Sequence, residues 1–302
     1  MKGAPKVANM IGGTEPGAKQ GRKPVRRRAL RRFMKNPLSI TGLVLVVALT
    51  VTAVFAPVIA PHDPATQHLL DKRARPFGKY ILGADQFGRD ILTRLIYGAR
   101  VSLVVAFFSV LIALAGGVII GTLCGYVGGL VDTVLMRFMD LLLSFPYLLL
   151  AIALISALGS GTLNTTLAIG IWALPTFARV ARAAVLGIKK HEYITAAQAI
   201  GAPAHQIIVS HILPNFFSLV VVYATLFMAN AMMMEAALSF LGLGVQPPTP
   251  SWGEMISSGR NFLMVAPHMA TIPGFAIMTA VLGFNLLGDG LRDALDPKMK
   301  VQ

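Results

Sequence analysis

The stretch EYITAAQAIGAPAHQIIVSHILPN, from Glu192 to Asn215, joins two long apolar segments. Its first eight residues favour a short helix that Gly201 can end, and Pro203 can begin a second helix that runs to Pro214. The small side chains of the first helix would let it lie close in the groove of a partner. We therefore expect this loop to bind a soluble protein outside the membrane.

The composition is that of a polytopic membrane protein. Of 302 residues, 55% are hydrophobic and only 13% are charged, and the mean hydropathy is +0.68. Six segments approach or exceed the roughly 20 apolar residues that a bilayer requires. Their approximate limits are 39–60, 101–126, 131–158, 163–187, 216–242 and 267–290. We therefore expect an all-α fold with six transmembrane helices.

The basic residues predict the orientation and exclude nucleic acid as the expected partner. The formal net charge is +14, yet residues 1–37 hold 11 of the 27 Lys and Arg against one acid, Glu15. A basic cluster just before the first apolar run is the positive-inside signal, with attraction to anionic membrane lipid as a secondary effect. We expect both termini in the cytoplasm, because six spans return the chain to the side on which it begins.

These limits divide the chain into consecutive parts. They are 1–37, a cytoplasmic and partly disordered segment; 38–60, the first transmembrane helix; 61–100, an outer segment; 101–292, five further helices that include the cytoplasmic loop 188–215; and 293–302, a cytoplasmic C-terminus. The outer segment carries seven Lys and Arg, against the charge rule. The N-terminal cluster is denser and comes first, so it decides the expected orientation.

Four glycines spaced by four predict a smooth ridge on the second span. They are Gly117, Gly121, Gly125 and Gly129. Positions i and i+4 share one helix face, so another helix can approach this ridge closely. We favour packing inside this chain, and contact with a second transmembrane subunit is the alternative.

Charged residues inside the spans have a structural and a functional interpretation. Arg137 and Asp140 are three residues apart and can face each other, and Pro146 can kink the same helix. Glu235 lies toward the outer end of the fifth span, and Asp289 toward the inner end of the sixth. Intramembrane charges can mark a transport pathway, but positions near the interfaces favour structural pairing.

No pattern for catalysis or metal binding is present. The sequence lacks the GxxxxGK[ST] loop that cradles ATP phosphates, and it lacks HExxH. Cys124 is the single cysteine, and the six histidines show no metal-ligand spacing. We therefore expect no enzyme activity and no cofactor in this chain.

The central loop resembles the coupling loop of ABC importer permeases, in which two alanines precede a glycine and a Leu–Pro pair. Ala196 and Ala197 stand at the alanine positions, and Gly201 stands at the glycine. Thr195 replaces the glutamate of the pattern, and His211 replaces an isoleucine, as in a common form of the peptide branch. The resemblance implies an ATPase-coupling contact made by Glu192, Tyr193, Thr195, Ala196, Ala197, Gly201, Ala202, His211 and Pro214.

Three further stretches resemble the dipeptide and oligopeptide branch of these permeases. They are LGADQFGRDILTRLIYGARVSL (82–103), AALSFLGLGVQPPTPSWGEM (236–255) and FNLLGDGLRDALDPK (284–298). With the loop they span most of residues 38–300. The match is with the second, or C-type, permease subunit, which implies the fold of a type I ABC importer permease.

The resemblance also implies partners and a cargo. Such a subunit forms a heterodimer with a related permease, and it works with two ABC ATPase subunits and a periplasmic or lipid-anchored substrate-binding protein. ATP and Mg²⁺ would be bound by the ATPases. The expected cargo is a dipeptide or oligopeptide, with glutathione, a nickel chelate or another small solute as the alternative. A secondary transporter driven by an ion gradient and a membrane scaffold are the alternatives of a different class.

The outer segment has two open interpretations. In one, its charged residues pair with one another around a turn that leads into the second span. In the other, they form a gate or a docking surface for the binding protein. The candidate residues are Asp85, Gly88, Arg89, Asp90, Arg94 and Trp252. We expect Trp252 at the lipid–water boundary or in contact with the binding protein.

Overall fold

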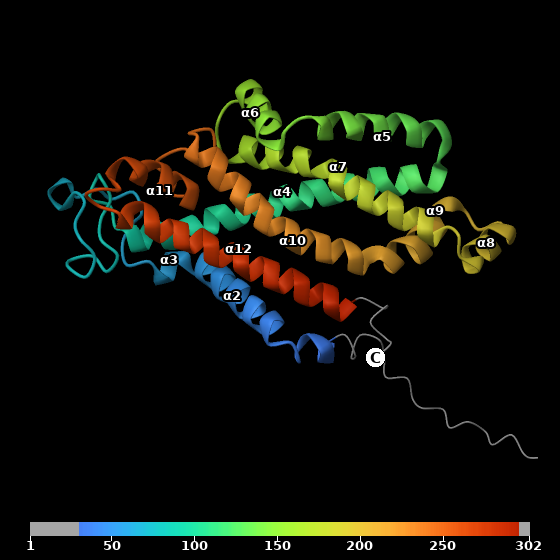
Figure 1. Cartoon of the computed structure of the whole chain (residues 1–302), viewed down its shortest axis with the longest axis horizontal. Helices are drawn as coiled ribbons and strands as arrows, with labels where there is room; N and C mark the ends of the chain where they lie inside the picture. The colour runs from blue at the N-terminus through green and yellow to red at the C-terminus, as the bar shows by residue number, and fades with distance from the viewer. Residues whose placement is uncertain (1–29, 296–302) are drawn as a thin grey trace, which may run out of the picture.

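Five long helices run lengthwise through the molecule (Figure 1), which the computed structural model describes for residues 30–295. They are α2 (Pro37–Val54), α4 (Ile91–Val127), α7 (Thr162–Ile188), α10 (Leu213–Phe240) and α12 (His268–Leu295). All five are long and apolar enough to cross a membrane, and a bent helix pair makes a possible sixth span. The expectation of an all-α polytopic membrane protein is confirmed.

Shorter elements gather at the two ends (Figure 1). We call the end that the charge pattern predicts to face outward the outer end, and the opposite end the inner end. The outer end holds α3 (Ala56–Ile59), η1 (Leu69–Asp71), α11 (Trp252–Gly259) and η3 (Arg260–Phe262). The inner end holds α8 (Glu192–Ala199) and α9 (Ala204–Ile207). Most of the predicted N-terminal segment 1–37, and residues 296–302 of the C-terminus, lie outside the described residues.

The closest helix packing joins α4 to α7 through the glycine ridge. A Cβ atom added at Gly117, Gly121 or Gly125 would come within 3.0 Å of atoms of α7. Gly129 lies outside this ridge, because it begins the next helix with φ of +58° and has nothing within 4 Å of a Cβ position. The three aligned glycines therefore pack inside this chain.

The third predicted span is broken in two. Helices α5 (Gly129–Ser144) and α6 (Tyr147–Leu158) meet at an angle of 96°. Phe145 and Pro146 between them have extended backbone, with ψ of 134° and 131°. A proline disfavours helical backbone in the residue before it, so the predicted kink at Pro146 is a full break.

Helix α4 begins ten residues earlier than the predicted start of the second span. The carboxylate of Asp90 caps it by accepting hydrogen bonds from the backbone amides of Leu92 and Thr93, both at 3.2 Å. The helix extends beyond the predicted span, and the apolar run does not show this because Arg94 and Arg100 interrupt it. A buried arginine inside a helix is not visible as hydrophobic periodicity.

The helix after the inner loop does not end at Pro214, as predicted. Helix α9 continues through a π-helical turn, Ile208–Ile212, into α10. Pro214 has no amide hydrogen for the carbonyl of Ser210, and its ring would clash there in a regular α-helix. The wider π-helical turn accommodates the proline, so α9 is the inner end of the fifth span.

Candidate functional site

Helix α8 is held at the inner end by a small apolar core. Ile194 is fully buried and Ala197 is 8% exposed. They pack in one cluster with Val185 of α7, Ile207 of α9 and Ile212 of the π-helical turn. One face of α8 is therefore fixed against the ends of α7 and α10.

The end of α8 is a complete Schellman motif around Gly201. The amide of Gly201 donates to the carbonyl of Gln198 at 3.0 Å, and the amide of Ala202 donates to the carbonyl of Ala197 at 3.1 Å. Gly201 has φ of +79°, a conformation that glycine adopts without steric cost. This motif turns the chain sharply from α8 toward α9.

The opposite face of α8 is open to solvent. Glu192, Thr195 and Ala196 are exposed, Tyr193 is 43% exposed, and Ile200 just after the helix is 85% exposed. Four of the predicted coupling residues thus share an outward face. Ala197 does not, so it supports the helix from below and is not available for contact with a partner.

Aromatic contacts tie α8 to the start of α10. The ring of Tyr193 stacks on His191 with centroids 5.5 Å apart and lies 6.2 Å from the ring of half-buried His211. Its hydroxyl accepts a hydrogen bond from Nδ2 of Asn215 at 3.2 Å. Pro214 is exposed and Ala202 is half-buried at the base of the same loop.

Lys189 connects the loop to α4. Its Nζ donates to the carbonyl of Tyr126 at 2.7 Å and lies 5.4 Å from the centre of the Tyr126 ring. A cation at the carbonyl end of a helix is electrostatically favourable. The junction between α7 and α8 is therefore joined to the inner end of α4, and displacement of α8 would reach both long helices.

At the outer end, Asp85 organises a buried turn. Its Oδ1 accepts from the amides of Phe87 and Arg89 at 2.8 and 2.9 Å, and its Oδ2 lies 2.6 Å from Nε of Arg89. Gly88 is required there: its φ is +75°, and a Cβ would collide with the carbonyl oxygen of His68. Asp85 and Arg89 are only 7% and 3% exposed.

Arg94 locks this turn to a distant part of the chain. Its guanidinium donates to Oε2 of Glu254 in α11 at 2.7 Å and to the carbonyl of Pro64 at 3.2 Å, and it lies 3.6 Å from Asp85. Arg94 is 1% exposed and Glu254 is 4% exposed. Glu254 was not selected from the sequence, because no spacing signal links residues 160 positions apart.

Asp90 has a different role from its neighbours. It does not pair with an arginine, as one interpretation expected. It caps α4, accepts from the hydroxyl of Thr93 at 2.7 Å, and lies 3.1 Å from Nδ1 of His62. Together Asp85, Arg89, Asp90 and Arg94 form a buried lock that holds the outer segment onto α4 and α11.

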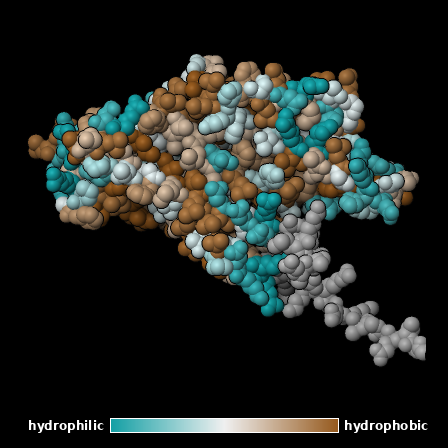
Figure 2. Space-filling view, viewed as in Figure 1, coloured by the Kyte–Doolittle hydropathy of each residue, from teal (hydrophilic) through white to brown (hydrophobic). Residues whose placement is uncertain are grey.

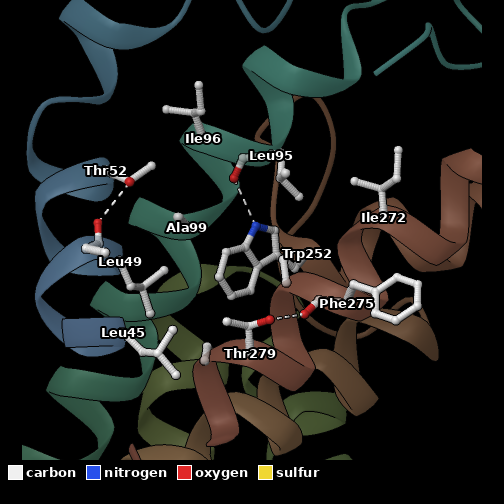
Figure 3. Close-up of a pocket in the computed structure, with 13 residues that line it drawn as sticks. Leu45, Leu49, Thr52, Leu95, Ile96, Ala99, Trp252, Ile272, Phe275 and Thr279 are labelled. Atoms are coloured by element: carbon white, nitrogen blue, oxygen red, sulfur yellow. Dashed lines mark hydrogen bonds between the residues drawn. The ribbon is translucent and has the colours of Figure 1, made fainter. Parts of the chain in front are cut away.

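Trp252 lies inside the protein and not at a lipid–water boundary (Figure 3). It is 2% exposed, and its Nε1 donates to the carbonyl of Leu95 at 2.9 Å. Gly98 makes room for the indole, since a Cβ there would lie 2.8 Å from the ring. The exposed apolar side chains of the outer end are others: Leu70 (102%), Phe77 (89%) and Met264 (97%).

Glu235 is buried where α10 meets α4. It is 1% exposed, and its carboxylate accepts from the hydroxyls of Ser102 and Ser239 at 3.0 and 2.8 Å. Among residues 30–295 no cation pairs with it, so its polar partners are serines. Within the same range no group of His, Cys, Asp and Glu has the geometry of a metal site.

The two aspartates of α5 pair with arginines of α7 and not with Arg137 of α5. Asp140 lies 2.6 Å from a terminal nitrogen of Arg179, and Asp132 binds Arg182 through both carboxylate oxygens at 2.5 and 2.6 Å. The predicted pairing of Asp140 with Arg137 was wrong, because α7 lies on the other side of Asp140. Sequence separation of 39 and 50 residues hides both pairs.

Two family models match the chain. Residues 117–301 match the inner membrane component of binding-protein-dependent transport systems. Residues 25–76 match the N-terminal transmembrane domain of oligopeptide transport permease C.

Similar proteins include dipeptide and glutathione permeases. The chain is 44% identical to the dipeptide transport system permease protein DppC of Alkalihalophilus pseudofirmus, over 91% of this chain and 90% of that protein. It is 43% identical to the di/tripeptide permease DppC of Pseudomonas aeruginosa, over 89% and 90%. It is 44% identical to the glutathione permease GsiD of Escherichia coli O6:K15:H31, over 89% of each chain.

A solved structure shares the fold. It shows inward facing conformations of the MetNI methionine ABC transporter, and it superposes on 67% of this chain and 97% of its own with a TM-score of 0.55 and 19% identity. At that identity the likeness shows the fold alone.

Proposed function

This chain belongs to the family of inner membrane components of binding-protein-dependent transport systems and is a permease subunit of an ABC importer, and we propose that it carries dipeptides or short oligopeptides across the bacterial cytoplasmic membrane. In this proposal two partner ATPases bind ATP and Mg²⁺ and hydrolyse the ATP. The chain itself has no phosphate-binding loop and acts as the transport component.

The exposed face of α8 is the observation that carries the ATPase-driven part of the proposal, and the peptide cargo is proposed from the named relatives. A short helix with small and polar outward residues projects from the inner end, while its other face is fixed by Ile194 and Ala197. Such a helix suits a groove on a soluble ATPase. Glu192, Tyr193, Thr195 and Ala196 are the proposed contacts, and Gly201 sets the angle at which they are presented.

The contacts around α8 support a mechanical role. Its apolar core includes α7 and the start of α10, and Lys189 joins the same region to α4. When ATP binding draws two ATPases together, displacement of α8 would change how these helices pack. A partner that binds one arrangement more tightly shifts the population toward it.

The second permease is proposed to cover α5 and α6. Met139 is the only buried residue described in α5, and Leu130, Phe138 and Leu141 are 80%, 55% and 54% exposed. The glycine ridge of α4 is already occupied by α7. A related permease on this face would complete a heterodimer, with the substrate pathway between the two subunits and lipid around them.

The outer end is proposed to receive the substrate-binding protein. The N-terminal basic cluster favours both termini in the cytoplasm, which directs residues 61–90 outward. The docking contact is assigned to the exposed apolar side chains Leu70, Phe77 and Met264, because the charged residues of the lock are buried. The lock would keep this surface in a fixed position above α4 and α11.

Glutathione is the second candidate cargo. A relative named as a glutathione permease is as similar to the chain, at 44% identity, as one named as a dipeptide permease. Glutathione is itself a peptide with free carboxylates. The ligand that remains bound to the partner binding protein after purification would separate the two.

Co-purification and transport together test the proposed function. The tagged full chain should bring down a second six-span permease and an ATPase. Vesicles that contain this complex should take up dipeptide only when ATP is present on the side of the membrane where the ATPases lie. Uptake that needs no ATPase and collapses with an ionophore would contradict the proposal and favour a secondary transporter.

A further inference from the structure

Five charged residues line a cavity between α5 and α7, within the membrane-spanning part of the chain. The cavity has a volume of about 540 Å³ and is lined by Asp132, Thr133, Met136, Arg137, Asp140, Arg179 and Arg182. Figure 2 shows hydrophilic side chains in this region amid a largely hydrophobic surface. The volume is within the range of about 300 to 1,000 Å³ that is typical of small-molecule sites.

The cavity extends from Asp132, three residues from the start of α5, to the pair formed by Asp140 and Arg179. Asp140 is eleven residues from the start of α5, and Arg179 is nine residues from the end of α7. At a rise of about 1.5 Å per residue, the two positions are about 16 and 14 Å along their helices. Both helices belong to candidate membrane spans by length and composition, so we place the pair on the membrane side of the inner loop.

This pair is nevertheless open. The side chains of Arg179 and Asp140 are 53% and 46% exposed, and Arg137 is exposed with no ion-pair partner among the described residues. Charges within membrane spans face water-filled cavities or protein because exposure to lipid is costly. An open, charged and concave wall therefore indicates water inside the assembled transporter.

We propose that this cavity is a transient binding site for the two charged termini of a zwitterionic peptide on the transport pathway. The proposal rests on the proposed function, since it assigns a site within that pathway. The peptide carboxylate would bind the guanidinium groups of Arg137 and Arg179, and the peptide ammonium would bind the carboxylate of Asp140. Asp132 and Arg182, joined by two hydrogen bonds, form the inner wall.

Exchange of ion-pair partners explains how such a site can fill and empty. In the empty cavity Asp140 and Arg179 satisfy each other at 2.6 Å. A zwitterion that enters replaces one ion pair by two of the same kind, and its carboxylate also meets Arg137, which has no ion-pair partner among the described residues of the empty cavity. Conduction needs binding strong enough to enter and weak enough to leave, and this exchange provides that balance.

Thiol labelling in the assembled transporter tests the site directly. Cys124 is the single cysteine, so Cys124→Ala gives a background in which Met136→Cys is the only thiol of this chain. A water-soluble cationic thiol reagent should label that position in the complex of permeases and ATPases, and millimolar dialanine should slow labelling at least threefold. N-acetyl-dialanine amide, which lacks both charges, should not slow it.

The control is Val134→Cys, two residues away on α5 and outside the cavity lining. Its labelling should be indifferent to dialanine. Absence of labelling at Met136→Cys, or equal effects of the charged and neutral peptides, would overturn the proposal. Both cysteine variants are first shown to take up dialanine with ATP, which separates failure of the proposed site from failure of the chain to act as a permease subunit.

A double variant without these two charges shows whether the ion pair of Asp140 and Arg179 binds peptide or only joins α5 to α7. Asp140→Leu with Arg179→Met keeps an apolar contact between the helices, and such replacements of ion pairs are often tolerated. The complex should assemble and its ATPase should still respond to loaded binding protein, while dialanine uptake falls at least tenfold. Uptake at the wild-type rate would show that the pair is only a structural tether.

Discussion

The two ends of the molecule place their polar residues in opposite environments. At the outer end Arg94 and Glu254 are 1% and 4% exposed and bind each other. At the inner end Glu192 and Thr195 of α8 are exposed, and only two residues of that helix are buried. Charged residues that attract attention in the sequence therefore form an internal lock at one end and a presented surface at the other.

The largest expected difference between the ends is in stability. Glu254→Ala leaves Arg94 buried without its main carboxylate, and breaking a buried ion pair in this way costs about 3 to 5 kcal/mol. The matched variant Glu192→Ala, at an exposed carboxylate, should change stability by less than about 0.5 kcal/mol. Thermal unfolding of the detergent-purified complex measures both, and equal losses would mean that the two ends do not differ in this way.

Two neighbouring alanines sharpen the comparison inside α8. Ala197→Glu forces a carboxylate against Ile194. It should lower the free energy of local unfolding of α8 by about 2 to 3 kcal/mol, the order of cost for an uncompensated buried polar group. Ala196→Glu places the same group in solvent and should leave amide protection unchanged while lowering uptake. Hydrogen exchange of α8 in the pair of permeases without the ATPases distinguishes the two variants, and equal protection in both would refute the assigned inward and outward faces.

Gly201 should have a smaller effect on stability and a large one on coupling. Gly201→Val must hold a side chain at φ of +79°, at a cost of about 1 to 2 kcal/mol, although space is available around it. The resulting shift of α8 should reduce both uptake and stimulated ATPase activity. Gly187→Ala, in a regular helix with open space, is the control and should preserve both activities.

The smallest effect is a pH dependence of the outer segment. The Nζ of Lys79 and the hydroxyl of Tyr80 donate to Asp71, and these hydrogen bonds hold the pKa of that carboxyl below its usual value of 3.8. A lowered carboxyl pKa stabilises the folded segment above the unfolded pKa, and this is lost as the pH falls through the folded pKa.

The protection factor of the outer segment, which compares the observed exchange rate with the intrinsic rate at the same pH, should therefore fall as the pH drops below about 4, the range in which a free Asp protonates. The change should vanish in Asp71→Asn. An unchanged pH profile in that variant would show that another group controls the segment.

Helices and the inner loop could be predicted from the sequence because their signals are local. Apolar length revealed the long spans, and Gly201 revealed the end of α8. The break at Pro146 was underestimated as a kink, since composition does not show whether the chain recovers its direction after a proline. The outer lock escaped prediction because Arg94 and Glu254 meet only in the folded chain.

Burial explains the remaining differences at the candidate sites. Positions 196 and 197 are both alanine, and only the packing of α8 shows that Ala196 faces outward and Ala197 inward. Tryptophan is a residue type that is common at membrane interfaces, yet the ring of Trp252 lies in the interior because Gly98 leaves space for it. Such choices depend on tertiary contacts that no local pattern records.

The central claim is that the outward face of α8 binds the ATPase. The most direct measurement is the amount of ATPase that co-purifies with the tagged full chain and the second permease, compared between wild type and Ala196→Glu. We expect at least a tenfold loss of ATPase from the variant, with the second permease still bound. An unchanged amount of ATPase would contradict the claim.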